Sequence, residues 1–338
     1  MQQELSILET LQGSALLITG ATGSFGKALV RHILDHHDPV RIVAYSRDEL
    51  KQYEARHHFG DDSRLQWVIG DIRDRERLVS AMHGVDHVVH AAALKQVDAG
   101  ERNPAEFVRT NILGSQNVAD AALEVGVRKV VALSTDKACR PINLYGATKL
   151  VADKLFIAAN LQTARHQTRF AVVRCGNILS SRGSVIPFFR EIGRVGKPLP
   201  ITDKRMTRFW LSLDQAVRFV VESLELMQGG ELFVPRIPSM RLVDLAEAVV
   251  PDALMYEVGL RPGEKLHEEM IHPDEAPNVI RLGNRYVVQS TFSDDWNYRP
   301  PADALPVPDG FSYCSDQNDQ WLSVDDLRSM LDRTGDLT

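Results

Sequence analysis

The sequence has little cysteine, no excess of basic residues and no long apolar run. Three cysteines in 338 residues are too few for a disulfide framework. The formal net charge of -6 argues against nucleic acid as the main partner, because a phosphate backbone selects a basic surface. No apolar run reaches the ~18 residues that span a membrane, and the start MQQELSILE lacks the basic flank of a signal peptide. We therefore expect a cytoplasmic protein with no nucleic-acid and no membrane partner.

Apolar runs of strand length alternate with helical patterns through the first half of the chain. This alternation predicts an α/β fold with a doubly wound parallel sheet of the Rossmann type, because each strand returns to the sheet through a helix. In such sheets ligands bind at the carboxyl ends of the strands, so residues that follow strands are expected to line one crevice. The expected strands are residues 15–19, 40–45, 65–69, 86–90, 129–134 and 169–174, and a long helix is expected over 104–124.

The first expected strand runs directly into a glycine-rich turn and a helix. Glycines in this turn allow a tight bend and a close approach of the backbone to a pyrophosphate, and the helix N-terminus offers free N–H groups. The context of strand, turn and helix favours dinucleotide binding over a simple turn. The expected cofactor contacts here are Gly20, Thr22, Gly23, Ser24, Phe25 and Gly26.

The segment after the second strand carries Ser46 and Arg47 where an NAD-binding protein usually has a carboxylate for the ribose 2′-hydroxyl. A hydroxyl and a guanidinium suit a 2′-phosphate, and Lys51 lies one helical turn further on, so NADP is favoured over NAD. The alternative is that Arg47 is an exposed cation balanced by Asp48 and Glu49. Further cofactor contacts are expected at Asp71, Ile72, Ala91 and Ala92.

The stretch 134–149, STDKACRPINLYGATK, contains the side chains best suited to chemistry. Tyr145 and Lys149 are four residues apart on an expected helix, so they share one face. The ammonium can then stabilise the phenolate and lower the pKa of Tyr145 from about 10, which would make the tyrosine a base. The alternative is an ordinary surface helix, since this spacing is common by chance.

Several motifs resemble those of known enzymes. TGATGSFG, DIRD, HAAA and YGATK are similar to the extended short-chain dehydrogenase/reductase superfamily. Within it, SRDELK, PINLYGATK, SRGSVIPFF, ITDKRMTRFW and RPGEKLHEEM resemble the inverting UDP-N-acetylglucosamine 4,6-dehydratases, over about residues 13–290. The chain departs from that group's pattern at Ala21, Asp98, Cys139-Arg140 and Cys175.

The resemblance implies an NADP-dependent lyase that carries out 4,6-dehydration of UDP-N-acetylglucosamine with inversion at carbon 5, at the start of pseudaminic acid synthesis. The product would be a UDP-4-keto-6-deoxy-L-arabino-hexose, and the family suggests a homo-oligomer, a dimer or a hexamer. A retaining 4,6-dehydratase and a UDP-sugar 4-epimerase stay open as alternatives. A third alternative is a non-catalytic NADP-binding regulator, which would leave the STDK and YGATK motifs unexplained.

The resemblance also assigns catalytic roles. Tyr145, beside Lys149, would take the proton of the sugar 4-hydroxyl while hydride leaves carbon 4. Lys137 would then remove the acidified hydrogen on carbon 5, and Asp136 would protonate the departing 6-hydroxyl. Lys137 must be neutral part of the time, so burial or neighbouring cations are expected to lower its pKa from about 10.4. The alternative is that Asp136 and Lys137 form an ordinary exposed pair.

Substrate contacts are expected from two sources. Guanidinium groups match phosphate oxygens, which makes Arg205, Arg208 and Arg261 candidates for the sugar diphosphate, with solvated surface charges as the alternative. The resemblance implies substrate contacts at Lys95, Asn177, Val185, Arg261 and Glu264, and Thr135 is a further expected contact because it follows a strand. His267 and His272 could suggest a metal, but they lack a companion cluster, so no metal is expected and salt-bridged positions are favoured.

The domain boundary is expected to be discontinuous. Residues 13–176 and about 205–236 would form the NADP-binding Rossmann domain. Residues 177–204 and about 237–338 would form the smaller substrate-binding domain. The tail over 291–320 has weak periodicity and is expected to be irregular cover, closed by a short helix over 324–331.

Overall fold

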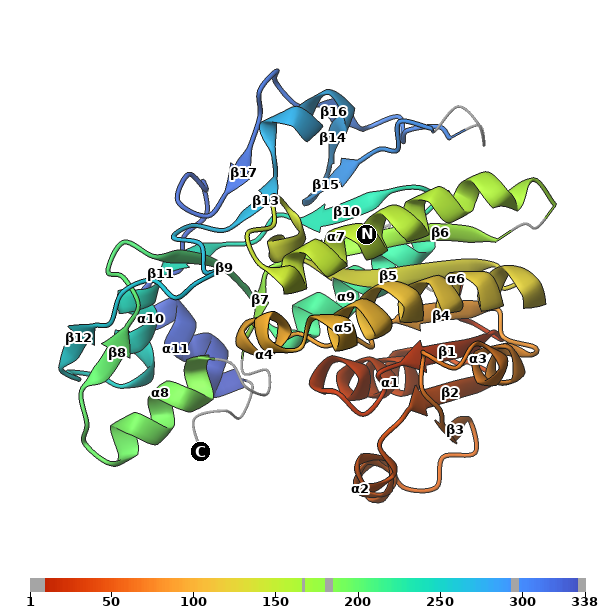
Figure 1. Ribbon diagram of the computed structural model, residues 1–338, viewed down its shortest axis with the longest axis horizontal. Helices are drawn as coiled ribbons and strands as arrows, with labels where there is room; N and C mark the ends of the chain where they lie inside the picture. The colour runs from red at the N-terminus through yellow and green to blue at the C-terminus, as the bar shows by residue number, and fades with distance from the viewer. Residues whose placement is uncertain (1–9, 166–167, 180–184, 293–297, 334–338) are drawn as a thin grey trace.

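The computed structural model describes residues 10–165, 168–179, 185–292 and 298–333. Its main element is a ten-stranded sheet with the order β16-β14-β15-β10-β6-β5-β4-β1-β2-β3 (Figure 1). The run from β10 to β3 is parallel, and its strands are β1 (Ala15–Thr19), β2 (Arg41–Ser46), β3 (Leu65–Ile69), β4 (His87–His90), β5 (Lys129–Thr135), β6 (Arg169–Cys175) and β10 (Leu232–Pro235). The expected strands agree with these bounds to within about a residue, and the doubly wound α/β fold is confirmed.

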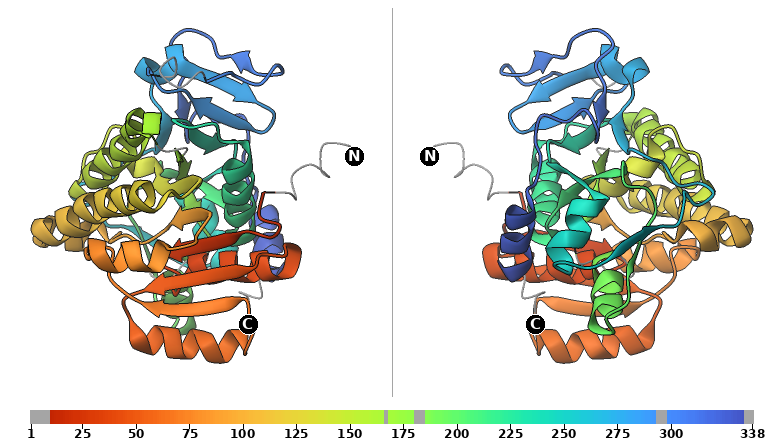
Figure 2. Two further views of the ribbon diagram at one scale, coloured as in Figure 1. Left: turned by 90° about the vertical axis from the view of Figure 1, so that its right-hand side faces the viewer. Right: turned by 90° about the vertical axis from the view of Figure 1, so that its left-hand side faces the viewer.

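Helices cover both faces of this sheet, as Figure 2 shows. On one face α1 (Ser24–His36) packs against α9 (Leu213–Leu226), and on the other α3 (Arg75–Met82), α6 (Gly114–Val125) and α7 (Leu144–Ala159) lie side by side. Central strands such as β1 and β4 are buried along their whole length, which explains their continuous apolar runs. The strand order reverses between β1 and β4, and a ligand crevice forms at such a switch point. At the edge, α2 (Glu49–Phe59) covers β3.

The long helix expected over 104–124 is interrupted. It consists of α5 (Pro104–Phe107), a π-helical segment (Val108–Leu113) and α6. The π-helical segment contains Asn111, whose buried side chain accepts from the N–H of Leu94, donates to the Leu94 carbonyl and donates to the Thr148 hydroxyl. Local π segments often occur at functional sites, and this one ties the loop after β4 to α7.

A second hydrophobic core lies beside the large sheet. Phe189, Trp210 and Leu245 are among its buried residues, and Leu327 and Leu331 join it from the end of the chain. Its elements are β7 (Asn177–Ile178), α8 (Val185–Arg194), β8 (Leu199–Ile201), β9 (Thr207–Leu211), β11 (Ser239–Arg241), α10 (Leu242–Val249), β12 (Met255–Glu257) and α11 (Val324–Arg333). The short helix expected near 324–331 is therefore confirmed as α11.

The C-terminal third contributes to both parts of the molecule. β14 (Val279–Leu282), β15 (Arg285–Val288) and β16 (Leu305–Pro306) extend the large sheet antiparallel beyond β10, and β13 (Glu269–Ile271) pairs with β17 (Tyr313–Cys314). Short connecting helices are α4 (Val97–Arg102), η2 (Asp136–Ala138), η3 (Asn160–Arg165) and η4 (Pro273–Asn278). Among the described residues, no helix has both the length and the apolar character to cross a membrane.

Candidate active site

A cavity of about 1520 Å³ opens at the carboxyl ends of the parallel strands. Its walls come from the glycine turn, the ends of β2 to β6, the start of α7 and the segment 261–268, and its volume is larger than one drug-sized ligand requires. The predicted site residues on its walls are Gly20, Thr22, Gly23, Ser24, Phe25, Gly26, Ser46, Arg47, Lys51, Asp71, Ile72, Ala91, Ala92, Lys95, Thr135, Lys137, Tyr145, Lys149, Asn177, Val185, Arg208, Arg261 and Glu264. Asp136 is fully buried next to Lys137, and Arg205 points to solvent while it pairs with Asp203.

The glycine turn brings the backbone close to its neighbours. Gly20 has φ +70°, and a Cβ there would lie 2.9 Å from the backbone nitrogen of Ala92. A Cβ at Gly26 would lie 2.4 Å from the Gly20 carbonyl oxygen, so the helix can pack on the turn only without a side chain. The N-cap residue of α1 is Gly23, which provides no side-chain cap, and the N–H groups of the first helical turn therefore face the cavity region.

A buried hydrogen-bond chain supports the opposite wall of this turn. Thr19 Oγ1 accepts from the N–H groups of Ala91 and Ala92 at 3.1 and 3.2 Å, and it pairs with His90 Nδ1 at 2.8 Å. The other ring nitrogen, His90 Nε2, lies 3.2 Å from Ser115 Oγ. Burial lowers the pKa of His90 to about 3, so the ring is neutral. The sequence analysis did not identify this support, because its members are distant in the chain.

The position expected to meet the ribose 2′ group carries both signs of charge. Arg47 Nη1 lies 3.9 Å from Asp71 Oδ2, and Arg73 forms the closer bonds to that carboxylate, at 2.7 and 3.0 Å. Burial acts to raise the pKa of Asp71, but the hydrogen bonds from Arg73 outweigh it and hold the pKa below its ordinary value. Lys51 pairs with Asp48 at 2.9 Å. Of the two arginines near Asp71, Arg47 is thus held more weakly than Arg73 at this end of the cavity.

Ser46 is oriented by a residue that the sequence analysis did not single out. Gln52 is buried, and its Nε2 donates to Ser46 Oγ, to the Ser46 carbonyl and to the Val68 carbonyl, each at 2.9 Å. Because Ser46 Oγ accepts this bond, its own proton can be donated toward the cavity.

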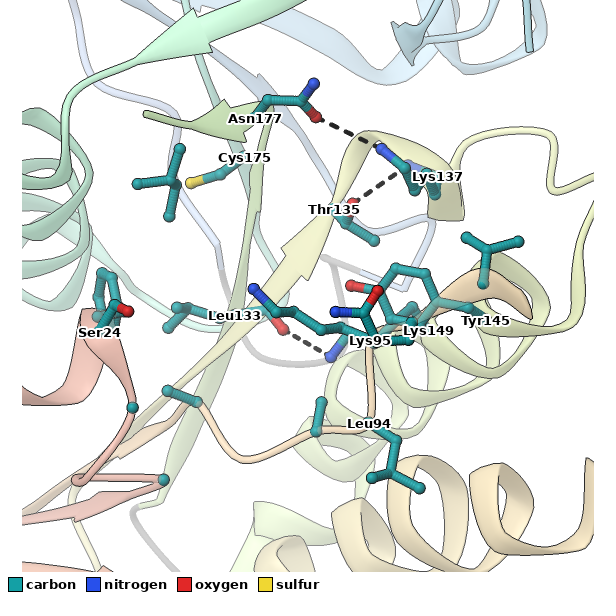
Figure 3. Close-up of a pocket in the computed structure, with 18 of the residues that line it drawn as sticks. Ser24, Leu94, Lys95, Leu133, Thr135, Lys137, Tyr145, Lys149, Cys175 and Asn177 are labelled. Carbon is teal, nitrogen blue, oxygen red and sulfur yellow. Dashed lines mark hydrogen bonds between the residues drawn. The ribbon is translucent and has the colours of Figure 1, made fainter. Parts of the chain in front are cut away.

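Tyr145 and its neighbours lie close together at the end of β5 (Figure 3). Burial raises the pKa of Tyr145 to about 12, while the charge of Lys137 and a hydrogen bond with Thr135 act to lower it. Lys149 Nζ donates to the Leu133 carbonyl at 2.6 Å. Our expectation that Lys149 brings the pKa of Tyr145 below 10 is therefore wrong for this structure, where Lys137 is the cation that acts on the phenol.

Lys137 is held between two carboxylates. Its Nζ lies 3.0 Å from Asp136 Oδ1 and 3.3 Å from Glu268 Oε1, and it reaches Asn177 Oδ1 at 3.5 Å. Burial alone would lower the pKa of Lys137, but Asp136 and Glu268 outweigh it and raise the pKa well above its usual range. The expectation of a lowered pKa is therefore wrong for this arrangement, because it left out the attraction of the ammonium to the carboxylates of Asp136 and Glu268.

The local fold positions Lys137 through a close backbone contact. A Cβ at Gly146 would lie 2.1 Å from the carbonyl oxygen of Lys137, so the turn η2 can sit on the first turn of α7 only if residue 146 is glycine. Asn143 caps α7 by accepting from the Gly146 N–H at 2.7 Å and donates to the Gly263 carbonyl at 2.8 Å. The motif PINLYGATK is thereby joined to the segment 261–268.

The predicted phosphate-binding arginines have different environments. Arg208 is buried, and its guanidinium donates to the carbonyls of Thr207, Lys265 and Leu266. Arg261 is exposed on the cavity wall, where the carboxylate of Glu264 accepts from its backbone N–H at 3.4 Å. Arg261 is thus the candidate whose guanidinium can meet a phosphate. Residues 181–184 of the motif SRGSVIPFF lie outside the described residues.

Among the described residues, no group of three or more His, Cys, Asp and Glu side chains could hold a metal ion. His267 Nδ1 bonds Thr207 Oγ1 at 2.8 Å, and His272 Nδ1 lies near the N–H and the carboxylate of Asp274. Both histidines therefore have local partners.

The chain is similar to known proteins over most of its length. A family model described as "Polysaccharide biosynthesis protein" matches residues 16–290. The UDP-N-acetylglucosamine 4,6-dehydratase (inverting) of Campylobacter jejuni strain 81-176 is 49% identical, over 95% of this chain and 98% of that protein. A UDP-glucose 4-epimerase of Rickettsia prowazekii is 41% identical, over 80% of this chain and 81% of that protein.

Solved structures are also similar to this chain. The X-ray structure of Pen from Bacillus thuringiensis has a TM-score of 0.89 and 35% identity, and the match covers 96% of this chain and 99% of that one. A dTDP-glucose 4,6-dehydratase double mutant, DesIV from Streptomyces venezuelae with NAD and DAU bound, has a TM-score of 0.66 and 25% identity over 74% and 86% of the two chains. The resemblance predicted from the motifs is confirmed, and the chain belongs to the polysaccharide biosynthesis protein family.

Proposed function

We propose that this protein is an NADP-dependent UDP-N-acetylglucosamine 4,6-dehydratase that inverts carbon 5. The observation that carries the proposal is the Asp136–Lys137 pair at 3.0 Å beside Tyr145 at the large cavity. An acid and a base in contact are what an elimination needs, and a reaction confined to carbon 4 needs neither. The 49% identity to an inverting dehydratase over nearly the whole chain supports the same conclusion.

The cavity fits a nicotinamide dinucleotide. A pyrophosphate would suit the turn, which has no side chains at Gly20 and Gly23, and the start of α1, which has no side-chain cap. Lys149 and Tyr145 lie at the other end of the same cavity. When bound, the cofactor would accept a hydride from carbon 4 and return it at carbon 6. The preference for NADP rests on Ser46 and Arg47, since Arg47 offers a cation to a 2′-phosphate and Ser46 a donor.

Tyr145 would remove the proton of the sugar 4-hydroxyl. Its pKa of about 12 is too high for an efficient base near neutral pH, so added positive charge must lower it before it acts. The charge of Lys137 and the hydrogen bond with Thr135 already act to lower the pKa at that value, so the added charge must come from the loaded site. We assign Lys149, held by the Leu133 carbonyl, to orienting the ribose next to Tyr145.

Lys137 and Asp136 would carry out the elimination. If a proton passes from Lys137 Nζ to Asp136 Oδ1, which lies 3.0 Å from that nitrogen, an N–H bond breaks, an O–H bond forms, and a neutral amine faces a carboxylic acid. The amine takes the proton from carbon 5, and the acid protonates the hydroxyl that leaves carbon 6 as water. The pair is then an ammonium and a carboxylate again, as in the structure.

We propose that Arg261, Glu264, Lys95, Asn177 and Val185 contact the nucleotide sugar from the cavity wall. Thr135 is kept as a substrate contact, while Arg208 is proposed to shape the wall rather than bind phosphate, because its guanidinium donates to three carbonyls. Arg205 stays a prediction that its pairing with Asp203 does not favour.

A UDP-sugar 4-epimerase is the second candidate, because relatives of that name in Rickettsia are about 40% identical. An epimerase would need Tyr145 and the cofactor, but it would have no use for a buried carboxylate in contact with Lys137. The epimerase hypothesis therefore predicts that Lys137→Met keeps activity, whereas the dehydratase hypothesis predicts its loss.

The function is tested by incubating the purified protein with UDP-N-acetylglucosamine and a catalytic amount of NADP⁺ in deuterated water. We expect proton NMR to show a new methyl signal at carbon 6, deuterium at carbon 5 and coupling constants of the L-arabino ring. A D-xylo ketone as the first product would contradict inversion and leave dehydration intact. An axial–equatorial change at carbon 4 without a methyl signal would instead indicate an epimerase.

The wider organisation is also a proposal. We propose two units, 13–176 plus 205–236 with the cofactor on the large sheet and 177–204 plus 237–338 for the substrate, although β14 to β16 of the second range extend the large sheet and pack in its core. We further propose a homo-oligomer, a dimer or a hexamer, since Leu113 and Val151 are exposed on neighbouring helices. Three free cysteines suit a reducing cytoplasm.

A further inference from the structure

Glu268 is a buried carboxylate at the active site to which neither the motifs nor the proposed reaction gave a role. Its side chain is 2% exposed and lies on the cavity wall. Its backbone is fixed on both sides by Ser315, whose Oγ accepts from the Glu268 N–H at 2.9 Å and whose N–H donates to the Glu268 carbonyl at 2.8 Å. The position of the carboxylate is therefore well determined by the fold.

The carboxylate of Glu268 contacts two cations. Oε1 lies 3.3 Å from Lys137 Nζ and 3.7 Å from Arg208 Nε. Oε2 is buried and has no hydrogen-bond partner among the described residues. A buried carboxylate stays charged only beside compensating cations, and Arg208, whose terminal nitrogens donate to backbone carbonyls, cannot leave this position. Arg208 thus provides Glu268 with a second, fixed cation besides Lys137.

The charges of the cluster change in a definite way during the proposed elimination. The neutral amine of Lys137 becomes an ammonium as the C5–H bond breaks and the new N–H bond forms, while the electron pair moves toward the carbon 4 ketone. Asp136 cannot stabilise this new charge fully, because at that moment it carries the proton destined for the leaving hydroxyl. Glu268 is the second carboxylate within reach of Lys137 Nζ, and the proposed elimination transfers no proton to it.

We propose that Glu268 is a positioning residue for the carbon 5 deprotonation, which holds Lys137 Nζ in place and stabilises the ammonium that forms there. This inference rests on the proposed dehydratase function. Arg208 is the second, fixed cation beside the Glu268 carboxylate. The competing explanation is that Glu268 only anchors the segment 261–268. An anchor would affect substrate binding and every chemical step alike, whereas the proposed role concerns one step.

Glu268→Gln separates these explanations, because it keeps the shape and removes the charge. The matched control is Glu269→Gln, whose side chain faces Arg140 at 3.9 Å and is not on the cavity wall. In Glu268→Gln we expect KM, and the rate at which the absorbance of the reduced nicotinamide appears on mixing, to change by less than about threefold. The rates of methyl-product formation and of deuterium uptake at carbon 5 should each fall roughly 100-fold. Glu269→Gln should match the unaltered protein in all these measurements.

The pH dependence of the slow step gives a readout that a structural anchor would not move. Lys137 is faced by Asp136 on its own turn, by Tyr145 on α7, by Glu268 and, beyond it, by Arg208. Removing the Glu268 charge lowers the pKa of Lys137, since a carboxylate that favours the ammonium is lost. The acid limb of the rate of deuterium uptake should therefore move to lower pH in Glu268→Gln.

Three results would overturn the role of Glu268: near-normal turnover of Glu268→Gln, equal losses in KM and in both steps, or an unchanged acid limb. If Glu268→Gln shows no cooperative melting transition, Glu268→Asp serves instead. That variant keeps the charge but withdraws it by one methylene, and we expect roughly a tenfold loss confined to the second step. If the unaltered protein forms the methyl product and any of these results is found, only the role of Glu268 is refuted and the proposed function stands. If the unaltered protein forms no methyl product, the proposed function itself is refuted.

Discussion

Arg47 is the residue on which the cofactor preference depends. It is a half-exposed cation near Asp71, while Arg73 holds that carboxylate more closely and Gln52 fixes the neighbouring Ser46 hydroxyl. The place after β2 where a carboxylate would normally select NAD by binding the 2′-hydroxyl thus carries Ser46 and Arg47 instead, and the nearby carboxylate of Asp71 is paired with Arg73.

We predict that Arg47→Ala weakens NADP⁺ binding by roughly 10- to 100-fold and NAD⁺ binding by less than about threefold. The reason is that a charge-assisted hydrogen bond to the 2′-phosphate is lost, worth about 1.5–3 kcal/mol. Calorimetric titration of both cofactors measures the difference. Arg56→Ala, an exposed arginine of the same helix region, is the control and should change neither affinity. Equal losses for the two cofactors in Arg47→Ala would contradict the NADP assignment.

At the level of elements, the contact between η2 and α7 places Lys137 relative to Tyr145. The two elements meet where Gly146 lies under the Lys137 carbonyl, and Asn143 connects the start of α7 to Gly263. Asn111 in the π-helical segment supports α7 from the other side through Thr148. The backbones of the base and the phenol are therefore positioned by these contacts and caps, while the ion pairs of Lys137 Nζ with Asp136 and Glu268 hold its ammonium group.

We predict that Gly146→Ala destabilises the fold by about 1–3 kcal/mol and abolishes most turnover, because the new Cβ would force η2 away from α7. Urea denaturation measures the first effect and the methyl-product assay the second. The cofactor affinity should be retained, since the glycine turn is not touched. Gly100→Ala is the control: its Cβ would meet the Phe107 ring at 3.2 Å, a milder contact, and turnover should persist. If Gly146→Ala were as active as Gly100→Ala, the contact would not position Lys137.

At the scale of the whole molecule, His90 couples stability to pH. The ring of His90 is neutral in the hydrogen-bond chain that joins the side chains of Thr19 and Ser115. Its pKa is about 3 in the folded state and about 6.5 in the unfolded state. Below pH 6.5 the unfolded state therefore binds a proton that the folded state does not. Stability should fall as the pH drops from about 6.5 toward 3, with a slope of up to about 1.4 kcal/mol per pH unit from this group.

Chemical denaturation at about pH 7 and about pH 5 tests this coupling. We predict that His90→Gln loses about 1–2 kcal/mol less stability between the two pH values than the unaltered protein does. His58→Gln, at an exposed histidine of α2, is the control for the substitution itself. An identical pH-dependent loss in His90→Gln would show that the acid sensitivity has another origin.

Much of the fold could be predicted because its signals are local. The runs ALLIT and KVVALST read as buried parallel strands, and Gly20 to Gly26 between a strand and a helix indicates a dinucleotide turn. Strand ends in a doubly wound sheet share one edge, so Thr135 and Asn177 could be assigned to one crevice without coordinates. Two features were not predicted: the π-helical segment within 104–125 and the antiparallel extension of the sheet by β14 to β16. A shift of the helical hydrogen bonds by one residue, and the pairing of distant strands, both leave little trace in the periodicity of the sequence.

The sequence by itself determined the cofactor cradle, the Tyr145–Lys149 spacing and the family, since each depends on residues adjacent in the chain or one helical turn apart. The tertiary structure alone decided the protonation of the site. Glu268 approaches Lys137 from a segment far away in the sequence, and its charge, together with that of the adjacent Asp136, reverses the pKa direction that burial predicted. Electrostatic interactions depend on distance through space and on burial, and neither quantity can be read from the order of residues.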